Sequence, residues 1–229
     1  MNRYPKTFRT VVGAATMAAL SLSAPAAVTA AHAQPEAPAA RAQAAAPAAG
    51  PTLDEVVAAL RAVGTMRANF TQTDRNGQSV SGVVTIKRPG KIRFQYQQGV
   101  PLLIVADGRS LTMIDYEVKQ VQRWPIRNSP LGALLDPSRD LSRFGTLQPT
   151  ANPDVASVEV RDRSHPEYGV ITLIFVRKAS APGGFELTSW VALDSQNKRT
   201  TIRLSGHSYG IPVADSAFNW SDPRIPNRR

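Results

Sequence analysis

The chain has 229 residues, no cysteine and a formal net charge of +10, with 27 lysine and arginine residues against 17 aspartate and glutamate residues. The lack of cysteine excludes a disulfide framework, and it excludes a bacterial lipoprotein, whose acyl anchor is attached to a cysteine directly after the signal. Nucleic-acid binding is not predicted, because the positive charges are scattered and form no clustered stripe with interleaved aromatic residues.

The first 33 residues have the pattern of a secretory signal peptide. Arg3, Lys6 and Arg9 precede a short apolar run at residues 11–22, and Ala31-His32-Ala33 is a cleavage site of the Ala-x-Ala type. The run is too short to suggest a permanent membrane helix. Cleavage near Ala33 would leave 24 basic and 17 acidic residues in an exported, soluble protein. The periplasm of a Gram-negative bacterium is therefore the predicted location.

The segment after the predicted cleavage site has little to bury. Residues 34–51 are Ala, Pro, Gln and Gly with one Glu and one Arg, which predicts a disordered tether. One folded domain is predicted over residues 52–222, with a C-terminal tail at 223–229. This domain of about 170 residues is long enough for a substantial core.

A helix is predicted at the start of the domain. Thr52 is the expected N-cap, and Glu55 stands at the reciprocal capping-box position. The apolar residues that follow recur at helical spacing, so one face of the helix is expected to pack inward. Gly64 is the expected end of the helix.

The pattern then changes to strands. Turns at Asn76-Gly77 and Asp107-Gly108 separate strands of an antiparallel meander. Two short helices, at about 129–135 and 140–144, interrupt it and are expected to cover the concave face of a curved sheet. The predicted strands are at about 66–74, 79–88, 91–97, 102–106, 110–115, 118–124, 156–162, 169–178, 185–194, 198–205 and 217–220.

Residues 80–96 predict two strands with one apolar face. Val80, Val84 and Ile86 share that face before the Pro89-Gly90 turn, and alternation puts Arg88 on it too. After the turn, Ile92, Phe94 and Tyr96 continue the apolar face, and Lys91, Arg93, Gln95 and Gln97 form a polar back. A guanidinium beside apolar side chains needs a partner. The alternative is that the strand ends before Arg88, which then turns to solvent.

Three patterns suggest enzyme or metal chemistry, and each has a plainer explanation. Gly206-His207-Ser208-Tyr209-Gly210 matches the G-x-S-x-G motif of esterases, but no helix and no later histidine follow Ser208. His165 and His207 are too far apart in sequence for a recognised zinc motif. Asp107 and Asp115 could form a carboxylate pair, although turn formation explains Asp107-Gly108 better.

Four short segments in fixed order carry a family resemblance. They are Met66–Gln72 with its F-x-Q pattern, Lys87–Phe94 with K-R-P-G, Leu103–Leu111 with A-D-G, and Pro130–Leu135, and Gly82 stands between the first two. With these segments the chain resembles the LolA family, the periplasmic carriers of outer-membrane lipoproteins. The resemblance runs from about Leu53 to the last strand. It implies an α+β fold, namely an incomplete (unclosed) antiparallel β-barrel of about 10–11 strands with an α-helical lid over a hydrophobic cavity.

The same resemblance implies roles for particular residues and partners. Arg88 matches the arginine that holds the lid and is needed for cargo transfer. The implied partners are acylated outer-membrane lipoproteins, an inner-membrane LolCDE-type ABC exporter and a LolB-like acceptor, with transient membrane contact and a monomeric carrier. No cofactor, metal or catalytic residue is implied. The expected cavity-lining residues are Val84, Ile86, Ile92, Phe94, Tyr96, Leu131, Leu134 and Leu135.

Two rival functions remain open at this stage. An envelope sensor or regulator on the same half-barrel would bind another protein, and an esterase would use Ser208. The chain also departs from the better-known carriers, whose first strands are rich in aromatic residues, because only 7% of its residues are aromatic.

Overall fold

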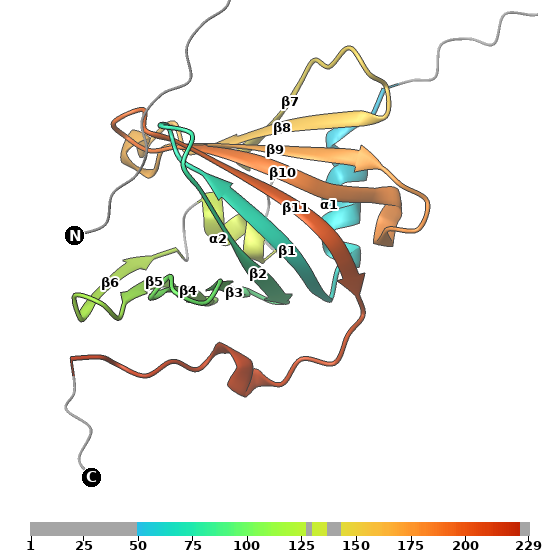
Figure 1. Cartoon of the computed structure of the whole chain (residues 1–229). Coiled ribbons are helices and arrows are strands. Elements are labelled where there is room, and N and C mark those ends of the chain that lie inside the picture. The colour runs from blue at the N-terminus through green and yellow to red at the C-terminus, as the bar shows by residue number, and fades with distance from the viewer. Residues whose placement is uncertain (1–49, 127–129, 137–142, 225–229) are drawn as a thin grey trace, which may run out of the picture. The chain divides into compact units, whose positions relative to one another are not determined.

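The computed structural model describes residues 50–126, 130–136 and 143–224, all of which belong to one compact unit, Ala45–Arg229. Eleven antiparallel strands form a single sheet in the order β6-β5-β4-β3-β2-β1-β11-β10-β9-β8-β7 (Figure 1). The strands β6 and β7 are its two edges, so the barrel is unclosed, as predicted. The strands are β1 (Thr65–Thr73), β2 (Ser79–Lys87), β3 (Lys91–Tyr96), β4 (Leu102–Asp107), β5 (Ser110–Asp115), β6 (Gln120–Pro125), β7 (Gly145–Gln148), β8 (Val155–Arg161), β9 (Val170–Arg177), β10 (Phe185–Leu193) and β11 (Arg199–Tyr209).

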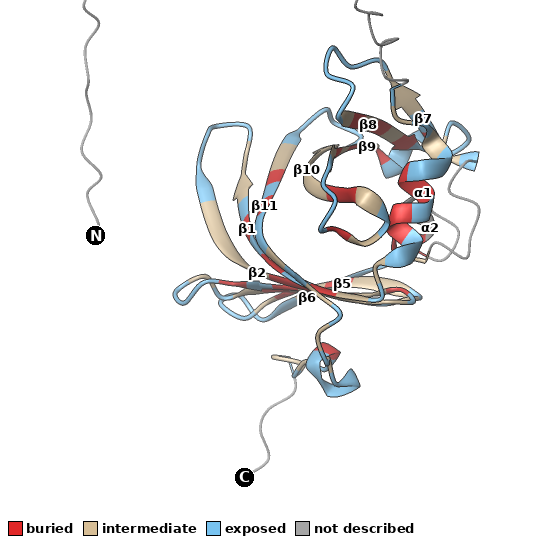
Figure 2. Cartoon of the chain, turned by 90° about the vertical axis from the view of Figure 1, so that its right-hand side faces the viewer, coloured by how far each residue is buried: buried red, intermediate tan, exposed pale blue. Residues whose placement is uncertain are grey.

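Helices α1 (Leu53–Ala62) and α2 (Pro130–Leu135) lie on the concave side of the sheet (Figure 2). Short 3-10 turns occur at η2 (Pro166–Tyr168), η3 (Pro182–Gly184) and η4 (Asp215–Phe218). No helix in the described ranges is long and apolar enough to cross a membrane.

The capping box of α1 is confirmed. The Thr52 hydroxyl accepts a hydrogen bond from the Glu55 amide at 3.2 Å, and the Glu55 carboxylate accepts one from the Thr52 amide at 2.7 Å. The helix ends at Ala62, with Val63 as its C-cap and not Gly64. Its buried residues pack against β8, β9 and β10, which places α1 over the C-terminal half of the sheet.

Two local predictions are wrong. The strand predicted at 217–220 is absent, since residues 217 and 218 belong to the turn η4 and residues 219 and 220 to no element. The eleventh strand is instead β7, directly after the predicted helix at 140–144. Most of that helix lies outside the described residues. The four residues of β7 carry little strand signal of their own, and pairing with β8, Gly145 opposite Val160, supplies their hydrogen bonds.

The C-terminal strap, residues 211–224, crosses the outer face of the sheet, opposite the helices (Figure 2). Phe218 is 7% exposed and packs with Leu103, Val105 and Ile114 of β4 and β5. The back of the sheet is therefore not uniformly polar, because a second small core forms beneath the strap.

Charged residues on the back of β2 and β3 hold the strap. The ammonium groups of Lys87 and Lys91 lie 2.7 and 2.9 Å from the Asp215 carboxylate. Arg93 donates hydrogen bonds to the carbonyl oxygens of Ala217 and Asn219 at 3.2 and 3.0 Å. Polar side chains that alternation predicted for this face thus bind the strap to the sheet.

Acid is expected to weaken the docking of the strap on the sheet. Hydrogen bonds and charge from Lys87 and Lys91 lower the pKa of Asp215 from 3.8 to about 2. Because the pKa of Asp215 is lowered in the docked strap, the ionised carboxylate stabilises docking above pH 3.8. This stabilisation is lost as the pH falls towards 2 and the carboxylate becomes protonated. Fluorine NMR of fluorotryptophan-labelled protein can follow Trp220, a strap residue that packs against the outer core, through an acid titration.

Two variants test this assignment. Asp215→Asn should remove the acid transition of the Trp220 signal. Asp222→Asn should preserve it, because Asp222 pairs with Arg224 inside the strap at 2.6 Å and not with the sheet. An unchanged transition in Asp215→Asn would show that another group controls strap docking.

Candidate functional site

An apolar cluster covers the concave face of the N-terminal half of the sheet. Strand pairing puts Val84 opposite Phe94 and Ile86 opposite Ile92, so the predicted residues of β2 and β3 do share one face. Val84 is fully buried, Ile86 is partly buried, and the three residues of β3 are buried. The remaining buried members of this cluster are Met66, Ala68, Phe70, Ala106, Ile126, Leu135, Ile202 and Leu204.

Aromatic rings concentrate in this interior although they are scarce in the chain. Phe70 meets Phe94 and Tyr96 edge to face, with ring centroids 5.3 and 5.1 Å apart, and Phe94 meets Trp190 at 6.0 Å. The Phe70 ring lies over Gly82, where an added Cβ would come within 2.7 Å of it. Sequence reasoning missed Phe70 and Trp190. Alternation of buried residues along β1 could have found Phe70, whereas Trp190 depends on the distant β10.

Tyr96 makes a polar side-chain contact at the rim of the cluster. The Tyr96 hydroxyl donates a hydrogen bond to the Gln72 side-chain oxygen at 2.7 Å. Burial raises the pKa of Tyr96 to about 12, so the phenol stays neutral at physiological pH. The other buried members of the cluster have apolar side chains, which suits an apolar ligand.

Helix α2 covers this cluster. Leu135 is 4% exposed and packs on the sheet together with the partly buried Leu131. Leu134 also belongs to α2, but its side chain lies outside the described residues. The helix is too short to be stable alone, so packing and its end contacts must hold it in place.

Arg88 binds the end of α2. Its Nη1 donates a hydrogen bond to the carbonyl oxygen of Leu135 at 2.9 Å, and the Gly90 amide donates to the same oxygen at 3.0 Å. The last carbonyls of a helix have no partner within the helix and attract cationic groups. The β2–β3 turn therefore grips α2 at its C-terminus.

Arg88 itself is partly buried, so the alternative in which it turns freely to solvent is wrong. Its backbone amide donates to the Gly64 carbonyl at 2.9 Å. Burial lowers the pKa of Arg88 to about 10, and the nearby charge of Asp136 opposes this shift. The guanidinium thus remains cationic at neutral pH, and its charge strengthens the bond to Leu135.

A small apolar pocket remains beside α2. Its volume is about 270 Å³, and it is lined by residues of β5, β6, α2, β8, β9 and η2, including Leu131, Trp124 and Tyr168. It lies where the two ends of the unclosed sheet face each other. Pockets for small molecules usually have ~300–1,000 Å³. The pocket beside α2 is therefore just below the usual size of a ligand pocket.

The esterase alternative is not supported by the geometry. Ser208 lies within β11, exposed and paired with Arg67, and not at a strand-to-helix turn. The buried His207 ring makes a 2.9 Å hydrogen bond to the Leu187 carbonyl, and its Nδ1 is 3.6 Å from Glu186. The motif is therefore a stretch of strand without the elbow that exposes a nucleophile.

The two aspartates of the suggested carboxylate pair are turn residues. Asp107 accepts hydrogen bonds from the amides of Arg109 and Ser110 at 2.8 and 2.7 Å. Asp115 accepts in the same way from the amides of residues 117 and 118 at 2.9 and 3.2 Å. Each carboxylate thus stabilises its own hairpin connection.

Comparisons with known proteins find similar proteins over most of the chain. The family model of outer membrane lipoprotein carrier protein LolA matches residues 61–221. An outer-membrane lipoprotein carrier protein of Dechloromonas aromatica is 29% identical over 181 residues, which cover 75% of this chain and 84% of that protein. One of Xanthomonas campestris pv. campestris is 26% identical over 180 residues, covering 70% and 79%. A solved LolA superfamily protein from Nitrosomonas europaea superposes with a TM-score of 0.42 at 11% identity, covering 74% and 99%. The family match spans all eleven strands, α2 and Arg88.

Proposed function

The chain belongs to the LolA family of outer-membrane lipoprotein carrier proteins, and from this membership we infer that it receives acylated lipoproteins from an inner-membrane LolCDE-type ABC exporter. It shields their acyl chains inside the half-barrel and delivers them to the outer membrane, where a LolB-like protein is the proposed acceptor. The family consists of carriers and not of enzymes, in keeping with the turn and strand positions of the residues that suggested catalysis. The proposed carrier works as an exported monomer in the periplasm after cleavage near Ala33.

The observation that carries this proposal is the way α2 occupies the interior. Leu131 and Leu135 of this helix cover an apolar face of the sheet, and Arg88 and Gly90 hold the end of the helix through hydrogen bonds to the Leu135 carbonyl. Acyl burial is worth ~0.8 kcal/mol per CH₂, so complete sequestration of a long chain would bind too tightly for release. Competition between α2 and cargo for the same face limits that affinity.

We assign the cargo contacts to the face that α2 covers. When α2 moves away, the sheet residues of the cluster become available to acyl chains, and the leucines of α2 can close over them. Arg88 is the proposed latch that favours the closed, empty state. The proposed acyl-chain contacts are Val84, Ile86, Ile92, Phe94 and Tyr96 from the sheet and Leu131, Leu134 and Leu135 from α2.

Native mass spectrometry of protein purified from the periplasm of an expressing Gram-negative host tests carriage directly. We expect a bound species whose mass includes the acyl chains of a lipidated protein. Leu131→Gln should reduce the loaded fraction severalfold, because it places an amide in the apolar interior. Val118→Gln should not, since Val118 is 65% exposed on the β5–β6 turn. A dominant protein partner without acyl groups would overturn carriage and support the sensor or regulator.

A further inference from the structure

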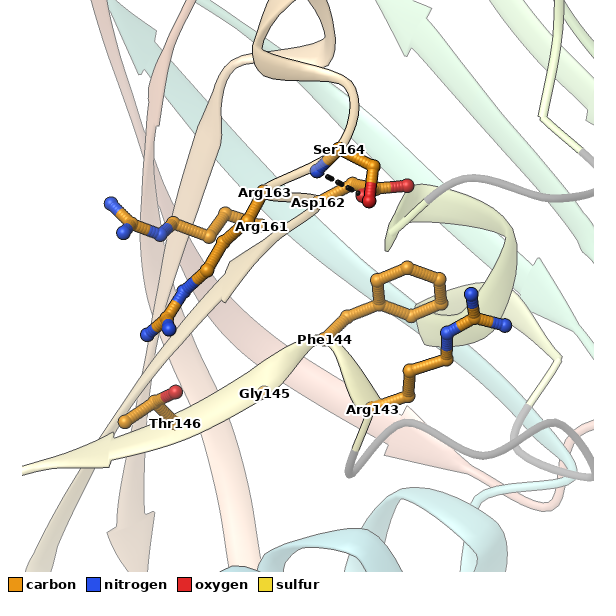
Figure 3. A pocket seen from close by; sticks show the side chains of 8 residues that line it. All are labelled: Arg143, Phe144, Gly145, Thr146, Arg161, Asp162, Arg163 and Ser164. Carbon is orange, nitrogen blue, oxygen red and sulfur yellow. Dashed lines mark hydrogen bonds between the residues drawn. The ribbon is translucent and has the colours of Figure 1, made fainter.

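The connection between β8 and β9 separates two unlike pockets at one end of the sheet. On one side, residues 161–164 and 143–146 line a polar pocket of about 340 Å³ (Figure 3). On the other side, residues 167–169 line the apolar pocket beside α2. The lining changes from apolar to polar at the end of β8, since Val160 lines the apolar pocket and Arg161 lines the polar one. The opening of the apolar interior is therefore bordered by a polar surface.

Three exposed arginines dominate the polar side. Among the lining residues, Arg143, Arg161 and Arg163 stand against one carboxylate, Asp162, which accepts a hydrogen bond from the Ser164 amide at 2.9 Å. Outside the pocket lining, Glu159 lies 3.4 Å from Arg161 Nε, so the group keeps an excess of positive charge. Figure 3 shows Arg161 and Arg163 on one side of the Phe144 ring and Arg143 on the other. The guanidinium groups are thus spread out and do not converge on one point. This spacing suits a plane of many anions better than one enclosed anion.

Two amphipathic aromatic side chains stand at the apolar side. Trp124 of β6 is 43% exposed and Tyr168 of η2 is 47% exposed, and both line the apolar pocket. Tryptophan and tyrosine are the residues that favour the boundary between lipid headgroups and hydrocarbon, because each has an apolar ring and a polar group. They flank the pocket from the edge strand β6 and from the connection between β8 and β9.

We propose that this end of the protein docks on the surface of an anionic lipid bilayer, with Arg143, Arg161 and Arg163 on the headgroups and Trp124 and Tyr168 at the hydrocarbon boundary. Docking turns the apolar pocket towards the lipid, so an acyl chain can pass between bilayer and protein with little exposure to water. The combination of spread cations with boundary aromatics favours a bilayer over an acidic protein surface. The proposal goes beyond carriage, because docking is a property of the empty protein.

Co-sedimentation of the full-length mature protein with lipid vesicles tests docking. We expect binding to vesicles of phosphatidylethanolamine with phosphatidylglycerol, weak binding to phosphatidylcholine vesicles, and loss of binding as salt is raised. Replacing the three docking arginines with glutamine should weaken binding by about 100-fold, since each basic residue near an anionic surface contributes about one factor of five.

The matched control removes the same charge elsewhere. Arg67, Arg199 and Arg203 are exposed on β1 and β11, away from both pockets, and the corresponding triple glutamine variant should bind within about threefold of the parent. Equal losses in both triple variants would mean attraction by net charge alone and would overturn the proposal. Loss in neither variant, or no binding by the parent protein, would overturn it as well.

A second readout tests the aromatic part. Lipids brominated on their acyl chains should quench the fluorescence of Trp124, and Trp124→Phe should abolish that quenching while the protein still sediments with the vesicles. Quenching that persists in Trp124→Phe would place another face on the bilayer and would contradict the docking geometry.

The experiments distinguish a failure of the docking proposal from a failure of the carriage proposal. A protein that co-purifies with acylated cargo but ignores anionic vesicles overturns docking and leaves carriage intact. A protein that binds vesicles through the three arginines but never loads acylated cargo overturns carriage and leaves docking intact.

Discussion

Arg88→Leu is expected to slow the transfer of acylated cargo to outer-membrane vesicles by about 10- to 100-fold while the protein stays folded. The variant loses the charged hydrogen bond to the Leu135 carbonyl, and hydrogen bonds to charged groups contribute ~1.5–3 kcal/mol. Without it the closed, empty state is less stable relative to the cargo-bound state, and each ~1.4 kcal/mol changes the balance tenfold. Cargo should therefore load normally and leave slowly.

Two further variants separate this latch from a general loss of charge. Arg88→Lys retains a cationic donor and should restore part of the transfer rate, although it has lost the planar guanidinium. Arg67→Leu removes an exposed arginine of β1 and should transfer cargo at the parental rate. Circular dichroism checks that each variant is folded. Transfer at the parental rate by Arg88→Leu would remove the proposed role of Arg88.

Phe70→Ala is expected to lower the free energy of unfolding by ~3–5 kcal/mol, the range for removal of a buried aromatic ring. Phe70 is 1% exposed, and its ring contacts two rings of β3, those of Phe94 and Tyr96. Gly82 has no side chain that could fill the space left by the ring. Urea unfolding followed by far-UV circular dichroism measures the change.

The control for this prediction is Tyr168→Ala, which also removes an aromatic ring but from a side chain that is 47% exposed. It should change the unfolding free energy by less than about 1 kcal/mol. A loss below ~1 kcal/mol in Phe70→Ala would show that the interior gives little stability, and that α2 and the sheet do not form a packed core.

The features of the fold that could be predicted from the sequence are those that depend on local residue patterns. The capping box of α1 and the alternation across β2 and β3 each depend on residues close together in the chain, and both are present. Alternation also placed Arg88 on the apolar face. Its partner could not be found in this way, because Leu135 is 47 residues further along the chain. The family resemblance predicted that Arg88 holds the lid, and the structure shows the hydrogen bond from Arg88 to the Leu135 carbonyl of α2.

Features decided by tertiary pairing were missed. The segment at 217–220 has the composition of a strand, but it forms no strand because Phe218 is drawn into the outer core over β4 and β5. Conversely, β7 has almost no local signal and exists because β8 offers it an unpaired edge. Trp190 joins the interior from β10, far in sequence from the strands whose alternation defined the cavity.

The unclosed sheet imposes a hazard that a closed barrel avoids. Within the described residues, β6 and β7 each have a neighbour on one side only, so their free backbone groups are templates for pairing with strands of other molecules. Both edges are poor templates: β7 has four residues, and β6 ends in Pro125 and carries Arg123. Such blunted edges oppose polymerisation of the protein through its open wall.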